Sequence, residues 1–459
     1  MSKRTKKPLR SLSEVPAVRD AAGALLDAVA EELRSRALSP AAYARAVQEV
    51  GRLRGRELFY PLLNLGAGRG ARAQLADGRV VLDFIGGIGV YGFGHSDRDL
   101  LETAVITAAC DNVFQGHLMP GLEYLNLSRA LRRHAGHRLR HVWLALSGAM
   151  ANENALKLIL QKHHPADFIV TFAGGFAGRT LALAELTDKP SYREGLPLSG
   201  RALIVPFYNP RDPQSTAASV AALNAHLARY PGRIAAMLFE LVQGEGGINV
   251  APREFFAALM QRCQEAGLAV WVDEVQTFGR TGELFAFQTF DLEPFVDVVT
   301  AGKLLQGSAV LFTHHYNPRP GLIAGTNAGA SVGMAVAARI IERLESEGYL
   351  GSEGRIAVLG RRIARRFELL AKRMPKAVSE RSGIGAMHAF VPWDGNPETV
   401  NAVLRTALEE GLLVFSAGGR ALKVRLLPPV NVTDEELEAG FAILEKALRR
   451  VGEERGLPC

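Results

Sequence analysis

Short apolar runs alternate with amphipathic stretches over the middle of the chain, from about His95 to Arg339. Many of the amphipathic stretches have helical spacing, as in Arg253–Ala266, for which Gly267 is the predicted C-cap. This alternation predicts an α/β fold with a mostly parallel sheet covered on both faces. The predicted strands are His141–Leu146, Phe168–Phe172, Leu203–Val205, Met237–Glu240, Leu268–Val272 and Val296–Thr300.

The N-terminal part follows other patterns. Residues from about Val18 to Leu58 have apolar side chains at helical spacing and predict a helix. Asp77-Gly78 stands between two short apolar runs, Ala73–Leu75 and Val80–Phe84, and predicts a β-hairpin.

The chain after about Ile340 is rich in helical patterns and has short strands near Gly385–Phe390 and Lys423–Leu426. This pattern predicts a second, smaller α+β domain, to which the N-terminal segment also contributes. We therefore divide the chain into an N-terminal segment (1–75), a large domain (76–339) and a C-terminal small domain (340–459).

Composition and charge favour a soluble globular enzyme. Of the 459 residues, 48% are hydrophobic and 22% charged, which is typical of that class. Five positive charges of the net +7 lie in the tail, at Lys3, Arg4, Lys6, Lys7 and Arg10. We interpret them as a solvated tail and expect no nucleic-acid partner. No apolar run is long enough to cross a bilayer and the tail has no apolar signal region, so we expect no membrane association. The three cysteines are far apart, which favours a reducing cytoplasm.

Two candidate groups follow predicted strands. Ligands of parallel sheets collect beyond the carboxyl ends of the strands, which places Ser147-Gly148, Glu240 and Asp273 at the functional edge. Asp273 is followed thirty positions later by Lys303. A carboxylate here can keep the pyridine nitrogen of a cofactor protonated, and a lysine can form an imine and shuttle a proton. Taken singly, the lysine can equally be a surface charge and the aspartate a loop cap.

Two glycine-containing segments have a functional and a structural interpretation. Ser147-Gly148-Ala149 precedes the predicted helix Met150–Lys162, where free N–H groups can bind phosphate, or where Ser147 can simply act as the N-cap. Gly174–Thr180 is a glycine-rich loop whose Phe176 can stack on a flat ring or pack in the core.

Two further patterns are rejected as ligand sites. Gly66–Ala71 formally matches a dinucleotide fingerprint, but a hairpin rather than a helix follows it, so we interpret it as a turn. The adjacent pairs His163-His164 and His314-His315 lack the spacing of metal ligands, and no metal site is predicted.

In this order the motifs resemble those of the class III (ω-amino acid, acetylornithine and ornithine-type) aminotransferases, which are pyridoxal-phosphate enzymes of fold type I. The resemblance runs from about Leu65 to Leu448. The matching segments are Leu82–Phe84 through Gly94-His95, Ser147-Gly148, Gly178–Thr180, Phe239–Gly247, Asp273–Gln276, Gly279–Gly282, Lys303, Gly325-Thr326 and Arg425–Pro429.

The resemblance implies a role for each matching residue. Lys303 would hold pyridoxal 5'-phosphate as a Schiff base and Asp273 would contact its ring nitrogen. Gln276 would lie near the phenolic oxygen, Phe176 would stack on the ring, and Gly148 and Ala149 would bind phosphate through their N–H groups. Thr326 would reach the phosphate of the neighbouring subunit, which implies an obligate homodimer with its active site at the interface. Arg425 would bind a substrate carboxylate, with Glu245 as its gate.

Several residues depart from the family's pattern. Met150 stands where glutamate is usual, Ala177 replaces a common histidine, and Ala330-Ser331 replaces Asn-Pro. The segment from Gln276 to Gly279 is one residue short, and a loop after Lys303 is abbreviated. Ile88 stands where ornithine-specific members have tyrosine, which argues against an ornithine transaminase. These departures leave the lysine–aspartate pair intact and leave the substrate open.

The resemblance implies a transaminase that moves an amino group from an ω-amino acid or an acylated diamine acid to 2-oxoglutarate. One alternative is an amino-acid racemase or epimerase with the same cofactor, which would abolish optical rotation without forming glutamate. A second is a non-catalytic scaffold with a decayed site, against which the retention of Lys303, Asp273 and Arg425 argues.

Overall fold

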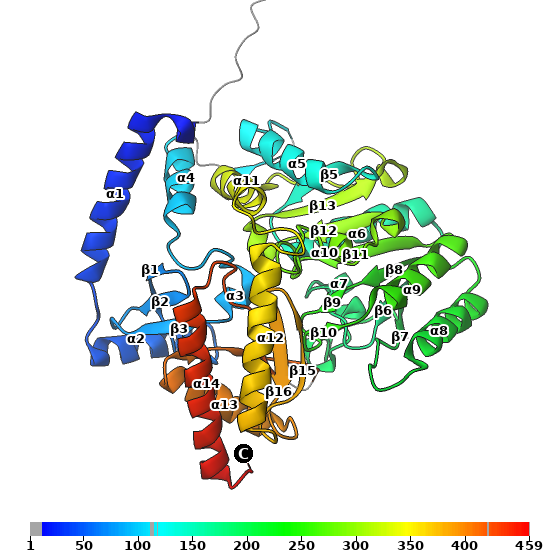
Figure 1. Cartoon of the computed structure of the whole chain (residues 1–459). Helices are drawn as coiled ribbons and strands as arrows, with labels where there is room; N and C mark the ends of the chain where they lie inside the picture. Colours follow the sequence, from blue (N-terminus) through cyan, green and yellow to red (C-terminus); the bar gives the residue numbers. More distant parts are fainter. Residues whose placement is uncertain (1–11, 111–113, 117, 420–421, 459) are drawn as a thin grey trace, which may run out of the picture.

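A seven-stranded sheet organises the central part of the chain (Figure 1). The computed structural model describes residues 12–110, 114–116, 118–419 and 422–458. In sheet order the strands are β5 (Leu139–Ala145), β13 (Ser308–Thr313), β12 (Val298–Ala301), β11 (Ala269–Glu274), β8 (Ile234–Phe239), β6 (Phe168–Phe172) and β7 (Ala202–Val205). Only β13 runs against its neighbours, so the predicted mostly parallel sheet is confirmed.

Strand β13 is the one strand of this sheet that the sequence analysis missed. Its residues form a continuous apolar run, and all six are buried. A short apolar run buried on both faces has no period that separates a strand from a buried helix or loop. The run also follows Lys303 closely, and a direct antiparallel return after β12 breaks the strand–helix alternation.

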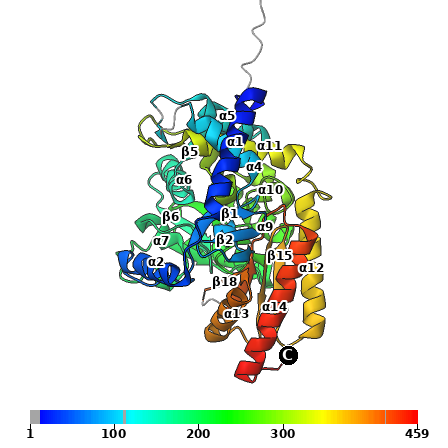
Figure 2. The ribbon, with the colours of Figure 1, turned by 90° about the vertical axis from the view of Figure 1, so that its left-hand side faces the viewer.

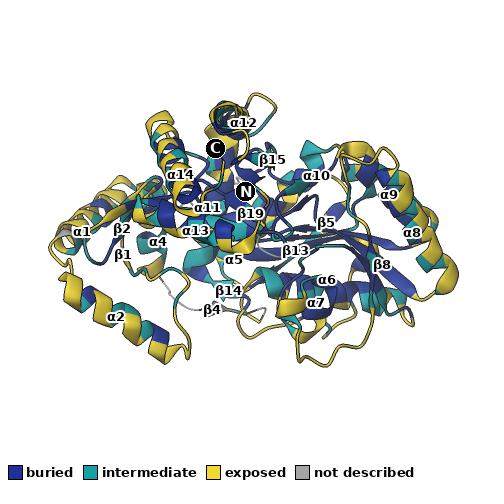
Figure 3. Ribbon diagram, turned by 90° about the horizontal axis from the view of Figure 1, so that it is seen from below, coloured by how far each residue is buried: buried dark blue, intermediate teal, exposed yellow. Residues whose placement is uncertain are grey.

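Helices cover both faces of the sheet (Figure 3). On one face lie α6 (Gly148–His163) and α7 (Leu181–Leu186), and on the other α8 (Ser215–Arg229) and α9 (Arg253–Glu265). Strand β11 alternates between these layers: Trp271 packs in the apolar cluster of α6, whereas Val270 and Val272 pack in that of α9. Because Asp273 follows Val272, the same alternation places Asp273 on the α6 side, at the carboxyl end of the strand.

Two four-stranded sheets lie beside the large one; the first combines strands from both ends of the chain and the second is built from C-terminal strands alone. The first has the order β1 (Asn64–Arg69), β2 (Arg72–Leu75), β3 (Val80–Asp83), β17 (Leu412–Leu413). The second has the order β15 (Ser379–Ile384), β16 (Met387–Val391), β19 (Lys423–Leu426), β18 (Phe415–Ala417). The hairpin at Asp77-Gly78 forms as predicted, and the parallel pairing of β3 with β17 joins the N-terminal segment to the C-terminal part. Strand β3 lies after residue 75 but belongs to the same sheet as β1 and β2, so the predicted boundary at residue 75 falls within a sheet. The domain division at residues 75 and 339 stays a prediction.

The helical pattern predicted from about Val18 to Leu58 is confirmed in part, because a break after Arg34 divides it. The structure has two helices, α1 (Pro16–Arg34) and α2 (Pro40–Leu53), which diverge in Figure 2. Ser39 accepts a hydrogen bond from the N–H of Ala42, and Pro40 occupies the first turn of α2. A capping serine followed by proline is a helix-start signal, and the apolar spacing on either side of it concealed the break.

Glycine-rich Gly66–Ala71 forms the end of β1 and the tight turn into β2, so no helix follows the false dinucleotide motif. The remaining long helices are α4 (Arg98–Ala108), α5 (Leu122–His134), α11 (Ser331–Ser346), α12 (Arg355–Arg373), α13 (Pro397–Glu409) and α14 (Asp434–Arg455). Within the described ranges, no helix combines the length and the apolar character that a membrane crossing requires. The basic tail from Lys3 to Arg10 lies outside the described residues.

Candidate active site

One cavity of about 540 Å³ lies at the carboxyl ends of β8, β11 and β12. Six residues singled out from the sequence line it: Gly148, Ala149, Phe176, Asp273, Gln276 and Lys303. They come from the ends of two strands, β11 and β12, from the start of α6 and from the loop after β6. Glu240, expected at the same edge, also lines it.

Lys303 follows β12 in a constrained backbone. Its φ is +45°, a conformation that is rare for a residue with a side chain and that recurs at functional sites. Burial lowers the pKa of its amine to about 8, although Glu245 and Asp273 favour the charged form. A lysine at this position is therefore a far better nucleophile near neutral pH than an exposed one.

Asp273 is buried at the end of β11, and both of its carboxylate oxygens accept hydrogen bonds. The N–H of Val275 donates to Oδ1 at 2.8 Å, and Nδ2 of Asn152 donates to Oδ2 at 2.7 Å. Burial raises the pKa of Asp273, opposed by these two donors and by Lys303. A nearby cation in the cavity would favour its ionised form further.

The N-terminus of α6 opens on this cavity. The Oγ atom of Ser147 accepts from the N–H of Met150 at 3.2 Å, so the capping interpretation of Ser147 is confirmed. The first N–H groups of a helix have no acceptor within it and attract anions. A Cβ atom on Gly148 would lie 2.7 Å from Cγ1 of Val275, so only glycine permits this close approach.

Phe176 lies in the loop after β6 and Gln276 in the loop after β11, and both line the same cavity. The backbone N–H of Phe176 donates to Oε2 of Glu240 at 2.7 Å. The side-chain oxygen of Gln276 is buried and has no partner among the described residues. A buried amide without a partner indicates a polar ligand group in this cavity.

Arg425 on β19 lies next to this cavity with Glu245. The guanidinium is fully buried, and its Nη1 atom is 2.7 Å from Oε1 of Glu245 and 3.5 Å from the carbonyl of Gly244. Its Nε and Nη2 atoms have no partner among the described residues. One edge of the guanidinium is thus satisfied, and the other retains the two donors that bind a carboxylate in bidentate fashion.

Glu245 has a lowered pKa, because the attraction of Arg425 and Lys303 outweighs the burial that opposes its ionisation. Thr326, in contrast, is exposed on a loop and is absent from the cavity lining within the chain. Of the nine predicted site residues, six line this cavity, Arg425 and Glu245 lie beside it, and Thr326 lies on an exposed loop away from it.

Sequence reasoning missed two contributors. Asn152 lies one turn into α6, and its only signal was a polar residue on the buried face of a helix. The second is the turn Gly86–Gly89, whose four residues all have positive φ and which leads into Val90 on the cavity wall. Its signal was the cluster of three glycines around Ile88.

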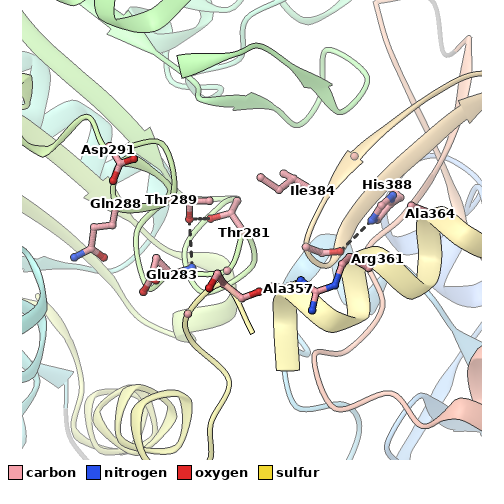
Figure 4. Close-up of a pocket in the computed structure, with 16 residues that line it drawn as sticks. Thr281, Glu283, Gln288, Thr289, Asp291, Ala357, Arg361, Ala364, Ile384 and His388 are labelled. Atoms are coloured by element: carbon pink, nitrogen blue, oxygen red, sulfur yellow. Dashed lines mark hydrogen bonds between the residues drawn. The ribbon is translucent and has the colours of Figure 1, made fainter. Parts of the chain in front are cut away.

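A second cavity of about 530 Å³ lies between the loop that follows Arg280 on one side and helix α12 with strands β15 and β16 on the other (Figure 4). Thr281 and Thr289 are hydrogen-bonded on one side, and Nε2 of His388 donates to the carbonyl oxygen of Gly385 on the other. None of the residues predicted for the active site lines it.

A comparison with known families identifies the chain. The model of the aminotransferase class-III family matches residues 56–448. The chain belongs to the class III aminotransferases. This class III aminotransferase is an enzyme that uses pyridoxal 5'-phosphate and transfers amino groups.

Named relatives of this aminotransferase act on several amines. It is 30% identical over 403 residues to an acetylornithine aminotransferase of Thermosynechococcus vestitus, covering 84% of this chain and 92% of the relative. It is 32% identical over 407 residues to a diaminobutyrate–2-oxoglutarate transaminase of Nocardia farcinica, covering 83% and 89%. Among solved structures, a lysine aminotransferase from M. tuberculosis in the internal aldimine form has a TM-score of 0.79 and 25% identity, covering 88% of this chain and 99% of that one.

The cavity of this aminotransferase fits its cofactor. It combines a helix N-terminus for a phosphate, a buried carboxylate for a ring cation, and an unpartnered amide of Gln276 for a ring substituent. The predicted fold type I architecture is also confirmed by the sheet and by the structural neighbours.

Proposed function

We propose that this aminotransferase takes an amino group from an ω-amino acid or an acylated diamine acid, of the acetylornithine or 4-aminobutyrate kind, and passes it to 2-oxoglutarate. The observation that carries the proposal is the half-paired guanidinium of Arg425, buried beside the cofactor cavity. Relatives named for acetylornithine, diaminobutyrate with 2-oxoglutarate, and 5-aminovalerate support this range of substrates.

Lys303 is the residue that would hold the cofactor covalently and would move the proton between substrate and cofactor. Its pKa of about 8 supports both tasks, because the neutral and the charged amine are then both populated near physiological pH. The bound cofactor supplies an electron sink for the charge that develops on the substrate carbon. Asp273 would hold the ring nitrogen protonated, Phe176 would cover the ring, and Gln276 would contact its oxygen.

Arg425 and Glu245 would select between the two substrates. With Glu245 on one edge of Arg425, the pair is close to neutral and suits a donor that presents an amine chain at this place. When 2-oxoglutarate enters, one of its carboxylates would bind the guanidinium in bidentate fashion through Nε and Nη2, and Glu245 would be released from Arg425.

A homodimer with shared active sites completes the proposal. Thr326 is exposed and away from the cavity of its own chain, as expected of a residue that contacts the partner's phosphate. Exposed apolar side chains also lie near the cavity, at Leu146 and Met150, and around the start of α5, at Leu118, Met119 and Leu122. Large exposed apolar side chains of this kind mark interaction surfaces. We place the enzyme in the cytoplasm, where the widely separated free thiols Cys110 and Cys263 are stable.

A panel of donors with 2-oxoglutarate tests the substrate proposal. Acetylornithine, 4-aminobutyrate, 5-aminovalerate and 2,4-diaminobutyrate are incubated with the holoenzyme, and the glutamate formed is measured. We expect at least one of them to be a good donor and Lys303→Ala to form no glutamate with any. Loss of optical rotation of an amino acid without glutamate would instead identify a racemase.

A further inference from the structure

Three buried side chains from three elements meet at the cavity wall. Asn152 of α6 donates from Nδ2 to Oδ2 of Asp273 at 2.7 Å, and Oγ1 of Thr300 donates to Oδ1 of Asn152 at 2.6 Å. Sheet register brings the partners together, because Asp273 on β11 is paired directly with Thr300 on β12. All three side chains are buried.

The orientation of the Asn152 amide has a single solution. Its Nδ2 group faces both the carbonyl oxygen of Ala177, at 2.7 Å, and the carboxylate of Asp273. A carbonyl and an ionised carboxylate can only accept hydrogen bonds, so the two N–H bonds of the amide must point at them. The amide oxygen is then left for Thr300, whose hydroxyl can donate.

This arrangement leaves every polar atom of the Asn152 side chain satisfied. The second carboxylate oxygen of Asp273 is held by the backbone N–H of Val275. Asp273 therefore has one fixed rotamer and donors on both oxygens, which stabilise its charged form. A leucine at position 152 would match the volume roughly but would remove the partner that Asn152 gives to Oδ2 of Asp273, to the carbonyl oxygen of Ala177 and to the hydroxyl of Thr300.

We infer that Asn152 is a positioning residue, oriented by Thr300, which aims the Asp273 carboxylate at the cofactor's ring nitrogen and keeps it ionised. The inference rests on the proposed role of Asp273 and adds two residues to the machinery of this site. Asn152 itself lines the cavity, but its hydrogen-bonding groups are all engaged with the protein, so it acts through Asp273.

The test compares Asn152→Leu and Thr300→Val with Asn154→Leu as a matched control. Asn154 lies on the same helix, two residues further on, and does not line the cavity. Three quantities are measured: the dissociation constant of pyridoxal phosphate, the pH midpoint of the visible absorbance of the holoenzyme, and the melting temperature of the cofactor-free protein.

For Asn152→Leu we expect the dissociation constant of pyridoxal phosphate to rise about tenfold, which corresponds to about 1.4 kcal/mol. The pH midpoint of the absorbance should also shift. Thr300→Val should change both quantities in the same direction but less, because the amide keeps its contact with Asp273. Asn154→Leu should change neither.

A lower melting temperature of Asn152→Leu with an unchanged dissociation constant and pH midpoint would show a merely structural role and overturn the inference. If Asn152→Leu does not fold, an unchanged dissociation constant and pH midpoint in Thr300→Val overturns it instead. A separate test on Lys303 distinguishes failure of this inference from failure of the proposed function. A visible band that Lys303→Ala retains would overturn the proposed role of Lys303, whatever the Asn152 variants do.

Discussion

At the scale of single residues, the chemistry depends on how burial changes the acidity of Lys303. Burial lowers the pKa of this amine from 10.5 to about 8. At pH 7 roughly a tenth of the side chains are then neutral, against on the order of one in three thousand for an ordinary lysine. A neutral amine is the form that attacks an aldehyde.

We therefore expect the rate at which cofactor-free protein binds pyridoxal phosphate covalently to rise with pH and to level off above about 8. The rate rises because the lysine loses its proton, so the increase is confined to pH values below the pKa of Lys303 in the folded protein. Stopped-flow absorbance between pH 6 and 10 measures it, with free Nα-acetyllysine as the reference. A rate that still increases steeply past pH 9.5, as for the reference, would contradict the lowered pKa.

Arg425→Lys should raise the KM for 2-oxoglutarate by roughly tenfold to a hundredfold, because charged hydrogen bonds contribute about 1.5–3 kcal/mol. A lysine keeps the charge but loses the two parallel donors at Nε and Nη2 that are free in Arg425. Arg365→Lys, an exposed change on α12, is the control and should leave KM unchanged. Equal KM values for both variants would exclude Arg425 as the carboxylate receptor.

At the scale of elements, the N-terminus of α6 depends on close packing against the loop that follows β11. Gly148→Ala would bring a Cβ atom to 2.7 Å from Val275 and force the helix start away. We expect at least about a tenfold weaker binding of pyridoxal phosphate, since a displacement of about 1 Å loses most phosphate contacts. Gly333→Ala in α11 is the control, because its Cβ would make only an ordinary contact at 3.6 Å.

Elements with a clear signal were predictable and those without one were not. Strand–helix alternation gave the parallel sheet, and Ser147 with Gly148 gave the start of α6. Strand β13 had no distinguishing period, and the break before α2 was concealed by continuous apolar spacing. Asn152 was missed because its partners, Asp273 and Thr300, come from distant segments that only the sheet register brings together.

At the scale of the whole molecule, a single chain lines one cavity with six of the predicted site residues, places Arg425 and Glu245 beside it, and leaves Thr326 on an exposed loop. The motif order predicted the family, which the match over residues 56–448 confirms. It could not predict how far Arg425 on β19 would lie from Lys303, because that depends on how the C-terminal strands pack on the large sheet.

A shared site predicts complementation between two defective chains. Lys303→Ala lacks the covalent attachment, and Thr326→Glu would repel the partner's phosphate. In a mixed dimer, one site combines the intact Lys303 of one chain with the intact Thr326 of the other. Refolding equal amounts together should restore about a quarter of wild-type activity, since half of the dimers are mixed and each has one good site. Activity no higher than the sum of the separate variants would exclude a site built from two chains.

The most direct measurement of the central claim is the site of cofactor attachment. The holoenzyme is treated with borohydride, which reduces an imine to a stable amine, and the digested protein is analysed by mass spectrometry. We predict one phosphopyridoxyl group per chain, on the peptide that contains Lys303. Attachment to any other lysine, or a chain that retains no label while the visible band is present, would contradict the account.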